Sequence, residues 1–172
     1  MSSNFFDASL VSTTLLCALV AGLVLGFAVV VMPGIAKLSD REFLAAFKRM
    51  DRIIQDRQPI FMLVWVGSIL STIVTLVLGT LELGGVELGG VELGVMWAAC
   101  GLYLLAVQGP TIRINIPLNN AVQALEIESL NDAAVAEARA RFEAPWNRWN
   151  RFRTLAAIAS VVALLVLQLL LR

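Results

Sequence analysis

The residues of this chain that are best suited to chemistry are two indoles, an amide and a guanidinium near its C-terminal end. Positions i, i+3, i+4 and i+7 are occupied by Trp146, Trp149, Asn150 and Arg153. On a helix these positions share one face. Two interpretations of this face stay open. It is an aromatic belt whose arginines reach a membrane interface, or it is the wall of a polar pocket between helices, roofed by indoles and fixed by Arg153.

A second group of amides lies in the segment 115–120, Asn-Ile-Pro-Leu-Asn-Asn. A proline donates no backbone hydrogen bond and disrupts the turn before it. Pro117, and Pro110 just before this segment, are therefore expected to break the helix and leave carbonyl groups unpaired. The side-chain amides of Asn115 and Asn119 can donate to such groups. Together with Asn120, they form the second half of the predicted site. If the pocket exists, Arg153 is expected to turn into the bundle and bond asparagine amides or backbone carbonyls of this segment.

The composition indicates what kind of protein positions these groups. Of the 172 residues, 59% are hydrophobic and 15% are charged, and the mean hydropathy is +0.82. A soluble domain of this size cannot bury so much apolar surface, so lipid must cover part of it. The 13 basic and 13 acidic residues cancel, and no nucleic-acid partner is expected.

Four apolar segments are long enough to cross a membrane, because about 20 helical residues span a hydrocarbon layer of about 30 Å. We therefore predict an all-α integral membrane four-helix bundle that forms one domain over residues 1–172. The predicted spans are approximately 10–32, 60–81, 88–107 and 152–171, with connections at 33–59 and 108–151. The second connection is expected to contain a helical segment, and Pro145 is expected in the first turn of the fourth helix, a position that suits proline.

The basic residues predict the orientation. Segments 33–59 and 108–153 hold six Lys and Arg residues each, and Arg172 is the only other basic residue. The positive-inside rule puts both large connections in the cytoplasm and both termini outside, in a membrane expected to be the bacterial inner membrane. Because residues 1–10 contain no Lys or Arg, the first apolar segment is expected to be a retained span and not a signal peptide.

The connection between the first two spans is predicted to contain an amphipathic helix. The sequence Ser39-Asp40-Arg41-Glu42 has the pattern of a capping box. Apolar side chains then recur at helical spacing at Phe43, Phe47, Met50 and Ile54, and the charged side chains are expected on the opposite face. Such a helix lies against the membrane surface or against the inner end of the bundle.

The connection between the second and third spans contains a five-residue repeat, Leu/Val-Glu-Leu-Gly-Gly/Val, over residues 81–95. Paired glycines at this period fit neither a helix nor a strand, and we interpret the repeat as a duplicated turn region. Its three carboxylates could instead bind a cation, although carboxylates without a fixed geometry are weak evidence for such a site.

No metal or other cofactor is predicted. The chain has no histidine, which excludes a histidine-ligated haem, copper or iron site. Cys17 and Cys100 each stand alone in an apolar segment and are expected to pack as small hydrophobic side chains.

Two segments together resemble a known family. Asn-Ile-Pro-Leu-Asn-Asn at 115–120 and Trp-Asn-Arg-Trp-Asn-Arg-Phe-Arg-Thr at 146–154 resemble the anthrone-oxygenase-like family of small four-span membrane proteins, and Val-Met-Pro-Gly at 31–34 is similar to that family's pattern. The resemblance covers nearly the whole chain except the glycine repeat. Characterised fungal members oxidise an anthrone to an anthraquinone with molecular oxygen. The resemblance implies the fold more firmly than this activity, because one scaffold hosts many functions.

If the chain is an oxygenase, the absence of histidine favours a cofactor-independent reaction, in which a deprotonated phenolic or polyketide-like molecule meets oxygen directly. This chemistry needs a base, an anion stabiliser and a dry aromatic pocket. The resemblance then implies that Arg153 stabilises the anion beside Asn150, and that the substrate binds to Asn115, Asn119, Asn120, Trp146 and Trp149. No carboxylate stands out in the sequence as the base.

The alternative function is a non-enzymatic membrane protein that binds a lipid or another hydrophobic small molecule, or that serves as a structural partner. A channel or transporter is disfavoured because the predicted spans hold almost no charge, which an ion path normally needs. The expected partners are membrane lipid and a hydrophobic small molecule, and the sequence leaves a homo-oligomer open.

The predicted topology can be tested with single cysteines in a variant in which Cys17 and Cys100 are replaced by alanine. In intact cells, a membrane-impermeant thiol reagent should label Glu87→Cys, because this position lies on the outer side. Glu137→Cys should be labelled only after the membrane is opened. Labelling of both positions from the same side would contradict the four-span arrangement.

Overall fold

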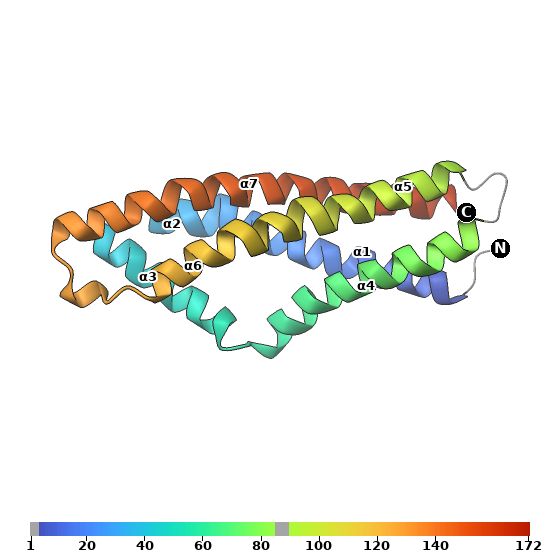
Figure 1. The fold of residues 1–172 in the computed structure, drawn as a ribbon. Helices are drawn as coiled ribbons and strands as arrows, with labels where there is room; N and C mark the ends of the chain where they lie inside the picture. The colour runs from blue at the N-terminus through green and yellow to red at the C-terminus, as the bar shows by residue number, and fades with distance from the viewer. Residues whose placement is uncertain (1–3, 85–89) are drawn as a thin grey trace.

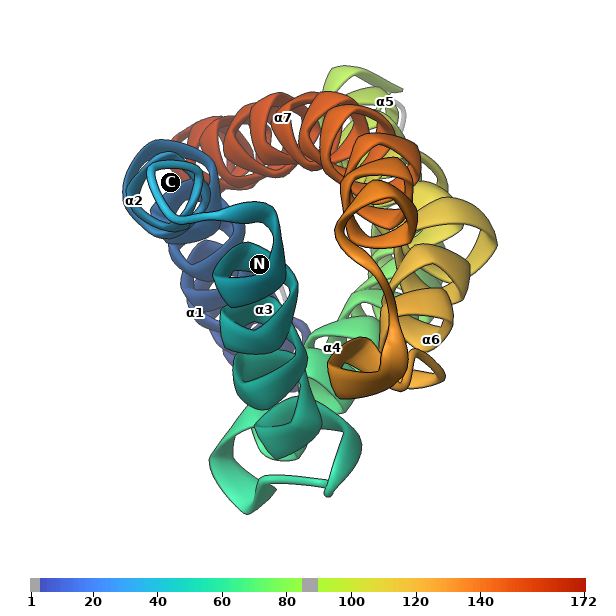
Figure 2. The ribbon, with the colours of Figure 1, turned by 90° about the vertical axis from the view of Figure 1, so that its left-hand side faces the viewer.

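The computed structural model of the chain describes residues 4–84 and 90–172, and no residue of these two ranges lies in a β-strand. Four long helical segments run side by side (Figure 1). Both termini lie at one end with the last turns of α4 and the first turns of α5, whereas α2, α3 and α6 lie at the other end, which Figure 2 views end-on. Four helices are long and apolar enough to cross a membrane, which confirms the predicted all-α membrane bundle.

The elements follow one another in a simple order. The first long segment consists of α1 (Asn4–Gly26), the π-helical turn η1 (Phe27–Val31) and α2 (Met32–Ile35). Next come α3 (Asp40–Gln55) and α4 (Pro59–Leu83). The third long segment consists of α5 (Gly90–Gly101), the π-helical η2 (Leu102–Gln108) and η3 (Thr111–Asn115), and α6 (Ile116–Gln123). The 3₁₀ turn η4 (Ile127–Ser129) leads to α7 (Asp132–Leu170).

Prolines modify the helices without breaking them, so the expected break at Pro110 and Pro117 was wrong. Each π-helical segment ends two residues before a proline, at Pro33, Pro110 and Pro117. A proline cannot donate to the carbonyl four residues earlier, and the wider i→i+5 pattern allows a later amide to do so. In η3, for example, the Ile116 N–H donates to the Thr111 carbonyl. The helical path therefore continues to the end of α6.

The last helix also starts earlier than the sequence pattern suggested. Pro145 was expected at the first turn of the fourth helix, but α7 begins at Asp132 and Pro145 lies inside it. The side chain of Asn131 caps α7 by accepting from the Ala134 N–H at 2.9 Å. The predicted helical segment between the third and fourth spans is therefore the first part of α7, in line with the span.

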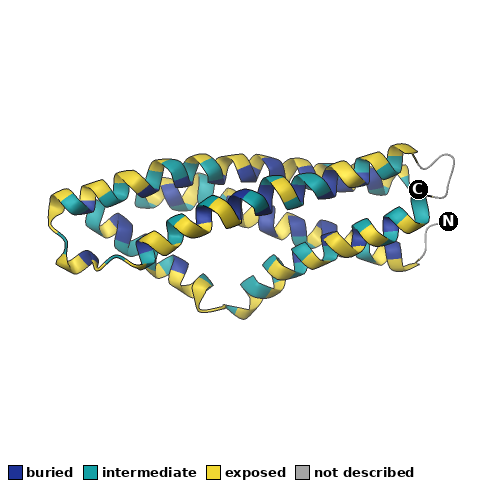
Figure 3. Ribbon diagram, viewed as in Figure 1, coloured by how far each residue is buried: buried dark blue, intermediate teal, exposed yellow. Residues whose placement is uncertain are grey.

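The outer surface of the bundle is apolar. Figure 3 shows exposed residues along the outward faces of the long helices and buried residues along the inner ones. In the most apolar stretch of α4 only 17% of the residues are buried, and in that of α7 only 39%. Side chains such as Leu63, Leu105 and Leu155 are at least 69% exposed. An apolar surface of this extent must be covered by lipid.

Inside the bundle, short polar contacts join the helices at close range. The hydroxyl groups of Thr13 and Thr75 lie 2.9 Å apart, and Ser160 donates to the Ala99 carbonyl at 2.8 Å. Such contacts allow helices to associate where lipid removes the hydrophobic driving force. Cys17 and Cys100 are free thiols buried in this core.

The predicted amphipathic helix is α3, and its capping box is present. The Glu42 N–H donates to the Ser39 hydroxyl at 3.4 Å, and the Ser39 N–H donates to the Glu42 carboxylate at 3.1 Å. Donation from the Ser39 hydroxyl and amide holds the pKa of Glu42 below its ordinary value. Behind this cap, α3 packs into a second apolar core formed by Met32, Phe43, Leu44, Phe47, Val122, Ile127, Val135, Phe142 and Trp146.

Basic side chains fasten α3 to its neighbours. Arg41 donates to the carbonyls of Ile127 and Leu130, and Lys48 donates to the carbonyl of Leu125. From α7, Arg139 donates to Asp40 at 2.9 Å and lies 4.3 Å from the ring centroid of Phe43. These contacts fix α3 between α6 and the first part of α7.

The glycine repeat spans the connection between α4 and α5. Its first three residues end α4, and residues 90–95 belong to the first turns of α5. Residues 85–89, and with them the middle carboxylate of the predicted duplicated turn, lie outside the described residues.

The packing of α4 predicts a sharp difference between two glycines. A Cβ added at Gly79 would lie 2.7 Å from Cε2 of Phe6 and closer still to the sulfur of Met96, and both side chains are fully buried. Gly79→Ala should therefore lower the free energy of unfolding by about 1–3 kcal/mol. Gly94→Ala, in α5, meets no atom within 4 Å and should raise it by up to about 1 kcal/mol.

Unfolding of both variants in detergent, followed by circular dichroism, measures this difference. Equal stabilities of the two variants would contradict the close packing of α4 against α1 and α5.

Candidate functional site

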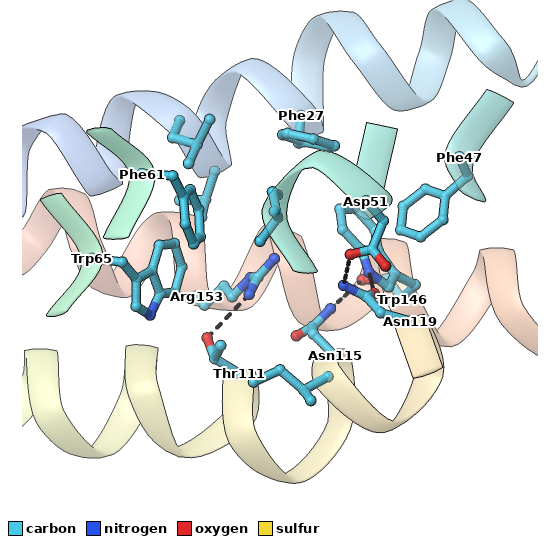
Figure 4. Close-up of a pocket in the computed structure, with 14 residues that line it drawn as sticks. Phe27, Phe47, Asp51, Phe61, Trp65, Thr111, Asn115, Asn119, Trp146 and Arg153 are labelled. Atoms are coloured by element: carbon cyan, nitrogen blue, oxygen red, sulfur yellow. Dashed lines mark hydrogen bonds between the residues drawn. The ribbon is translucent and has the colours of Figure 1, made fainter. Parts of the chain in front are cut away.

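A cavity of about 170 Å³ lies where the long helices meet α3. Figure 4 shows side chains entering it from every long helical segment and from α3. Most of its wall is aliphatic or aromatic, and five polar residues interrupt the wall. The cavity is lined by Leu23, Val24, Phe27, Phe47, Asp51, Ile54, Phe61, Trp65, Thr111, Asn115, Ile116, Asn119, Trp146 and Arg153.

Arg153 turns into the bundle and lines this cavity, and it is only 7% exposed. Its Nε and one terminal nitrogen donate to Oδ1 of Asn150 at 3.1 and 3.0 Å, and its other terminal nitrogen donates to the Thr111 hydroxyl at 3.0 Å. A guanidinium has five N–H donors, so two remain for another acceptor. Its carbon also lies 5.6 Å from the ring centroid of Trp146, within the range of a cation–π contact.

Asn150 is the residue that holds Arg153 in place. It is fully buried, and its side-chain nitrogen donates to the Val24 carbonyl of α1 at 3.1 Å. Asn150 itself does not line the cavity. The expectation that Arg153 bonds the segment 115–120 was wrong, because its partners come from one helical turn earlier in α7 and from η3.

Asn115 reaches a backbone carbonyl of α7, and not one left free beside Pro117 as expected, and it keeps an unused acceptor. Its side-chain nitrogen donates to the Trp146 carbonyl at 3.4 Å. Its Oδ1 is buried and has no hydrogen-bond partner in the described structure. Because Asn115 is 1% exposed and lines the cavity, this oxygen is suited to accept a hydrogen bond from a bound molecule.

Asn119 bonds two side chains and no backbone group, so the prediction that it donates to a free backbone carbonyl was wrong. Its side-chain nitrogen donates to Oδ1 of Asp51 at 2.8 Å, and its Oδ1 accepts from the indole of Trp146 at 2.8 Å. The helix continues through Pro117 and does not break there as expected.

Two predicted residues lie elsewhere. Trp149 does not line the cavity, and its ring packs edge-on against Phe152 at 5.5 Å between centroids. Asn120 is exposed and accepts from Gln55 at 3.2 Å. The pocket interpretation therefore describes Trp146 and Arg153, whereas Trp149 lies outside the cavity.

Sequence reasoning missed the carboxylate of Asp51. This residue is 3% exposed, lines the cavity and accepts from Asn119, Gln123 and Gln55. The spacing of four that joins Phe43 and Phe47 continues to position 51, so the helical pattern already placed Asp51 on the buried face. The charges of α3 were instead assigned to the opposite face as a group.

The aromatic wall was also only partly predicted. Phe27, Phe61 and Trp65 line the cavity from η1 and from the start of α4. Phe61 and Trp65 stack at 5.3 Å between ring centroids, and Trp65 donates to Gln108 at 3.1 Å. Nothing in their spacing distinguishes them from other lipid-facing aromatic residues. Across residues 4–84 and 90–172, no three Cys, Asp or Glu side chains gather closely enough to hold a metal ion.

The bundle and its cavity define a small helical membrane protein with an internal binding site. The family model described as anthrone oxygenase matches residues 61–163, which is more than half of the chain. The chain therefore belongs to the anthrone oxygenase family. The match contains both segments on which the resemblance rested, at 115–120 and 146–154, and the segment 31–34 lies outside it. Neither a curated protein nor a solved structure matches the chain.

The contacts of Asn119 predict a stability difference between adjacent residues. Asn119→Leu would leave the Trp146 indole and one oxygen of Asp51 without their partner, and an unpaired buried polar group costs about 1–3 kcal/mol. The melting temperature in detergent should therefore fall clearly. Asn120→Leu, at an exposed position, should change it little. Equal melting temperatures for the two variants would show that the Asn119 contacts do not form.

Proposed function

We propose that this protein is a cofactor-independent oxygenase that acts on a hydrophobic phenolic or polyketide-like molecule of the anthrone class. Membership of the anthrone oxygenase family supports the substrate class. The observation that carries the proposal is the buried guanidinium of Arg153, which lines an otherwise mostly apolar cavity and has two N–H donors free. A flat aromatic ligand suits such a cavity, and an oxygen on its edge would accept from Arg153.

The overall reaction balances without a further reductant. An anthrone carries a methylene carbon between two aromatic rings, opposite a ketone. One O₂ converts this CH₂ group into a second carbonyl group, with one oxygen atom entering the product and the other leaving as water. The first step removes a proton, and the resulting carbanion shares its charge with the ketone oxygen. The carbanion then passes an electron to O₂, and the two radicals combine into a peroxide, which loses water to give the carbonyl.

In this reaction Arg153 binds the ketone oxygen as negative charge develops on it. Preorganised donors in a site that excludes water stabilise such an anion strongly. Asn150 and Thr111 hold the guanidinium, and the free Oδ1 of Asn115 accepts from a phenolic hydroxyl of the ligand. The rings of Trp65 and Trp146 contribute apolar walls beside the ligand.

The positive-inside pattern supports a site at the cytoplasmic side of the membrane, because the cavity lies beside α3 and the inner ends of the spans. A hydrophobic substrate would reach it through the bilayer or the lipid interface. If the protein binds such a molecule without consuming oxygen, it is a binding protein for hydrophobic small molecules, which is the second candidate function.

Two arginines in one helix provide the test. Arg153→Lys keeps the charge but loses the planar fork that bonds Asn150 and Thr111 together. Oxygen consumption by the purified protein with an anthrone should therefore fall by about 10²-fold or more, as expected for the loss of a preorganised anion donor. Arg151→Lys, at an exposed position, should keep the wild-type rate. Equal rates for the two variants, or no oxygen consumption by the wild type above the rate without protein, would contradict the proposed function.

A further inference from the structure

The cavity holds a second charged group that the proposed anion site does not use. Asp51 enters it from α3, whereas Arg153 enters from α7 (Figure 4). The two side chains do not form an ion pair with each other, so each presents its charge to the cavity separately.

A buried carboxylate without a cation is unusual, because removing its charge from water is costly unless an opposite charge compensates. No Lys or Arg in the described parts of the chain forms an ion pair with Asp51. Lys48 lies one helical turn earlier, yet its ammonium group donates to the Leu125 carbonyl instead.

Neutral amides hold the carboxylate in one orientation. Asn119 donates to Oδ1 at 2.8 Å, and Gln123 and Gln55 donate to Oδ2 at 2.9 and 2.7 Å. Each partner donates and Asp51 accepts, which suits an ionised carboxylate. An ionised carboxylate has about four acceptor sites, so about one remains after these three bonds. Oδ1 carries one of the three bonds and Oδ2 carries two, which leaves the free site on Oδ1.

From these contacts we infer that Asp51 is the general base of the site, and that it takes the proton from the methylene carbon of the bound anthrone. This inference rests on the proposed function. The methylene carbon and the ketone oxygen lie at opposite edges of the central ring of an anthrone. A ligand whose ketone oxygen meets Arg153 therefore turns its methylene carbon toward another part of the cavity wall, and Asp51 is the only carboxylate among the residues that line it.

Asp51 can carry out each proton transfer of the reaction and return to its starting state. Asp51 accepts one proton as the carbanion forms, and it returns that proton to the peroxide oxygen after O₂ has added. It then removes the remaining hydrogen of that carbon as a proton, while the O–O bond breaks and the carbonyl forms. The departing hydroxide takes this proton and leaves as water, so the carboxylate is restored.

Proton removal can be measured apart from oxygenation. Under anaerobic conditions in D₂O, a base that removes the methylene proton exchanges it for deuterium, and mass spectrometry follows this exchange in an anthrone. The wild-type protein should accelerate the exchange above the rate without protein. Asp51→Asn, which is nearly isosteric, should slow both the exchange and oxygen consumption by about 10²-fold or more. It should still bind the anthrone, as quenching of the fluorescence of Trp65 and Trp146 would report.

The matched control is Asp56→Asn, which removes an exposed carboxylate at the end of the same helix and should leave both rates unchanged. If Asp51→Asn does not fold, Asp51→Glu keeps the charge and displaces the carboxylate by one CH₂ group. It should slow the exchange while the anthrone still binds.

The outcomes separate the two proposals. Suppose that the wild-type protein consumes oxygen and that the Asp51→Asn or Asp51→Glu protein exchanges protons at the wild-type rate. This result would overturn the role of Asp51 and leave the oxygenase intact. Proton exchange that depends on Asp51, without oxygen consumption, would support the base and overturn the oxygenase. A wild-type protein that does neither would overturn both.

Discussion

Burying a guanidinium among apolar helices is the constraint on which the inner half of this bundle depends. Moving a charge out of water costs several kcal/mol per ion even after relaxation, unless its N–H groups find acceptors. Asn150 and Thr111 provide those acceptors for Arg153, and Asn150 donates in turn to the Val24 carbonyl. Three of the long helical segments therefore meet at one hydrogen-bonded point. Their relative register is fixed there, and the cavity beside Arg153 follows from it.

The position of α3 obeys a second electrostatic rule. Its buried face carries Asp51, whose partners Asn119 and Gln123 both belong to α6. Its outer edges carry Arg41 and Lys48, which bind carbonyl groups of the loop between α6 and α7. The basic residues that indicate the orientation of the chain in the membrane thus also fasten α3 to the bundle.

The fold could be predicted from the sequence because hydropathy and capping are local signals: four apolar stretches and the Ser39–Glu42 box became four long helices and α3. The shared face of Asn150 and Arg153 indicated a pocket wall as one of two interpretations, and the structure buries Arg153. The fate of the prolines was not, because the π-helical turns that accommodate them depend on backbone adjustment in the assembled bundle. Asp51 was missed because its importance comes from α6 and α7, which are distant in sequence. Which of two neighbouring amides or indoles lines the cavity depends on the rotation of whole helices, and spacing alone does not decide it.

The length of α7 places the cavity at a particular depth. This helix has 39 residues and is about 58 Å long, roughly twice the thickness of the hydrocarbon layer. Arg153 lies 17 residues before its last residue, or about 26 Å along the axis, so it lies close to one boundary of that layer. Flat molecules with an apolar body and a polar edge accumulate at this boundary, as tyrosine and tryptophan side chains do. The relevant concentration of such a ligand is then its mole fraction among the lipids. Occupancy of the cavity would therefore vary with the amount of membrane in an assay as much as with the amount of ligand added to the water.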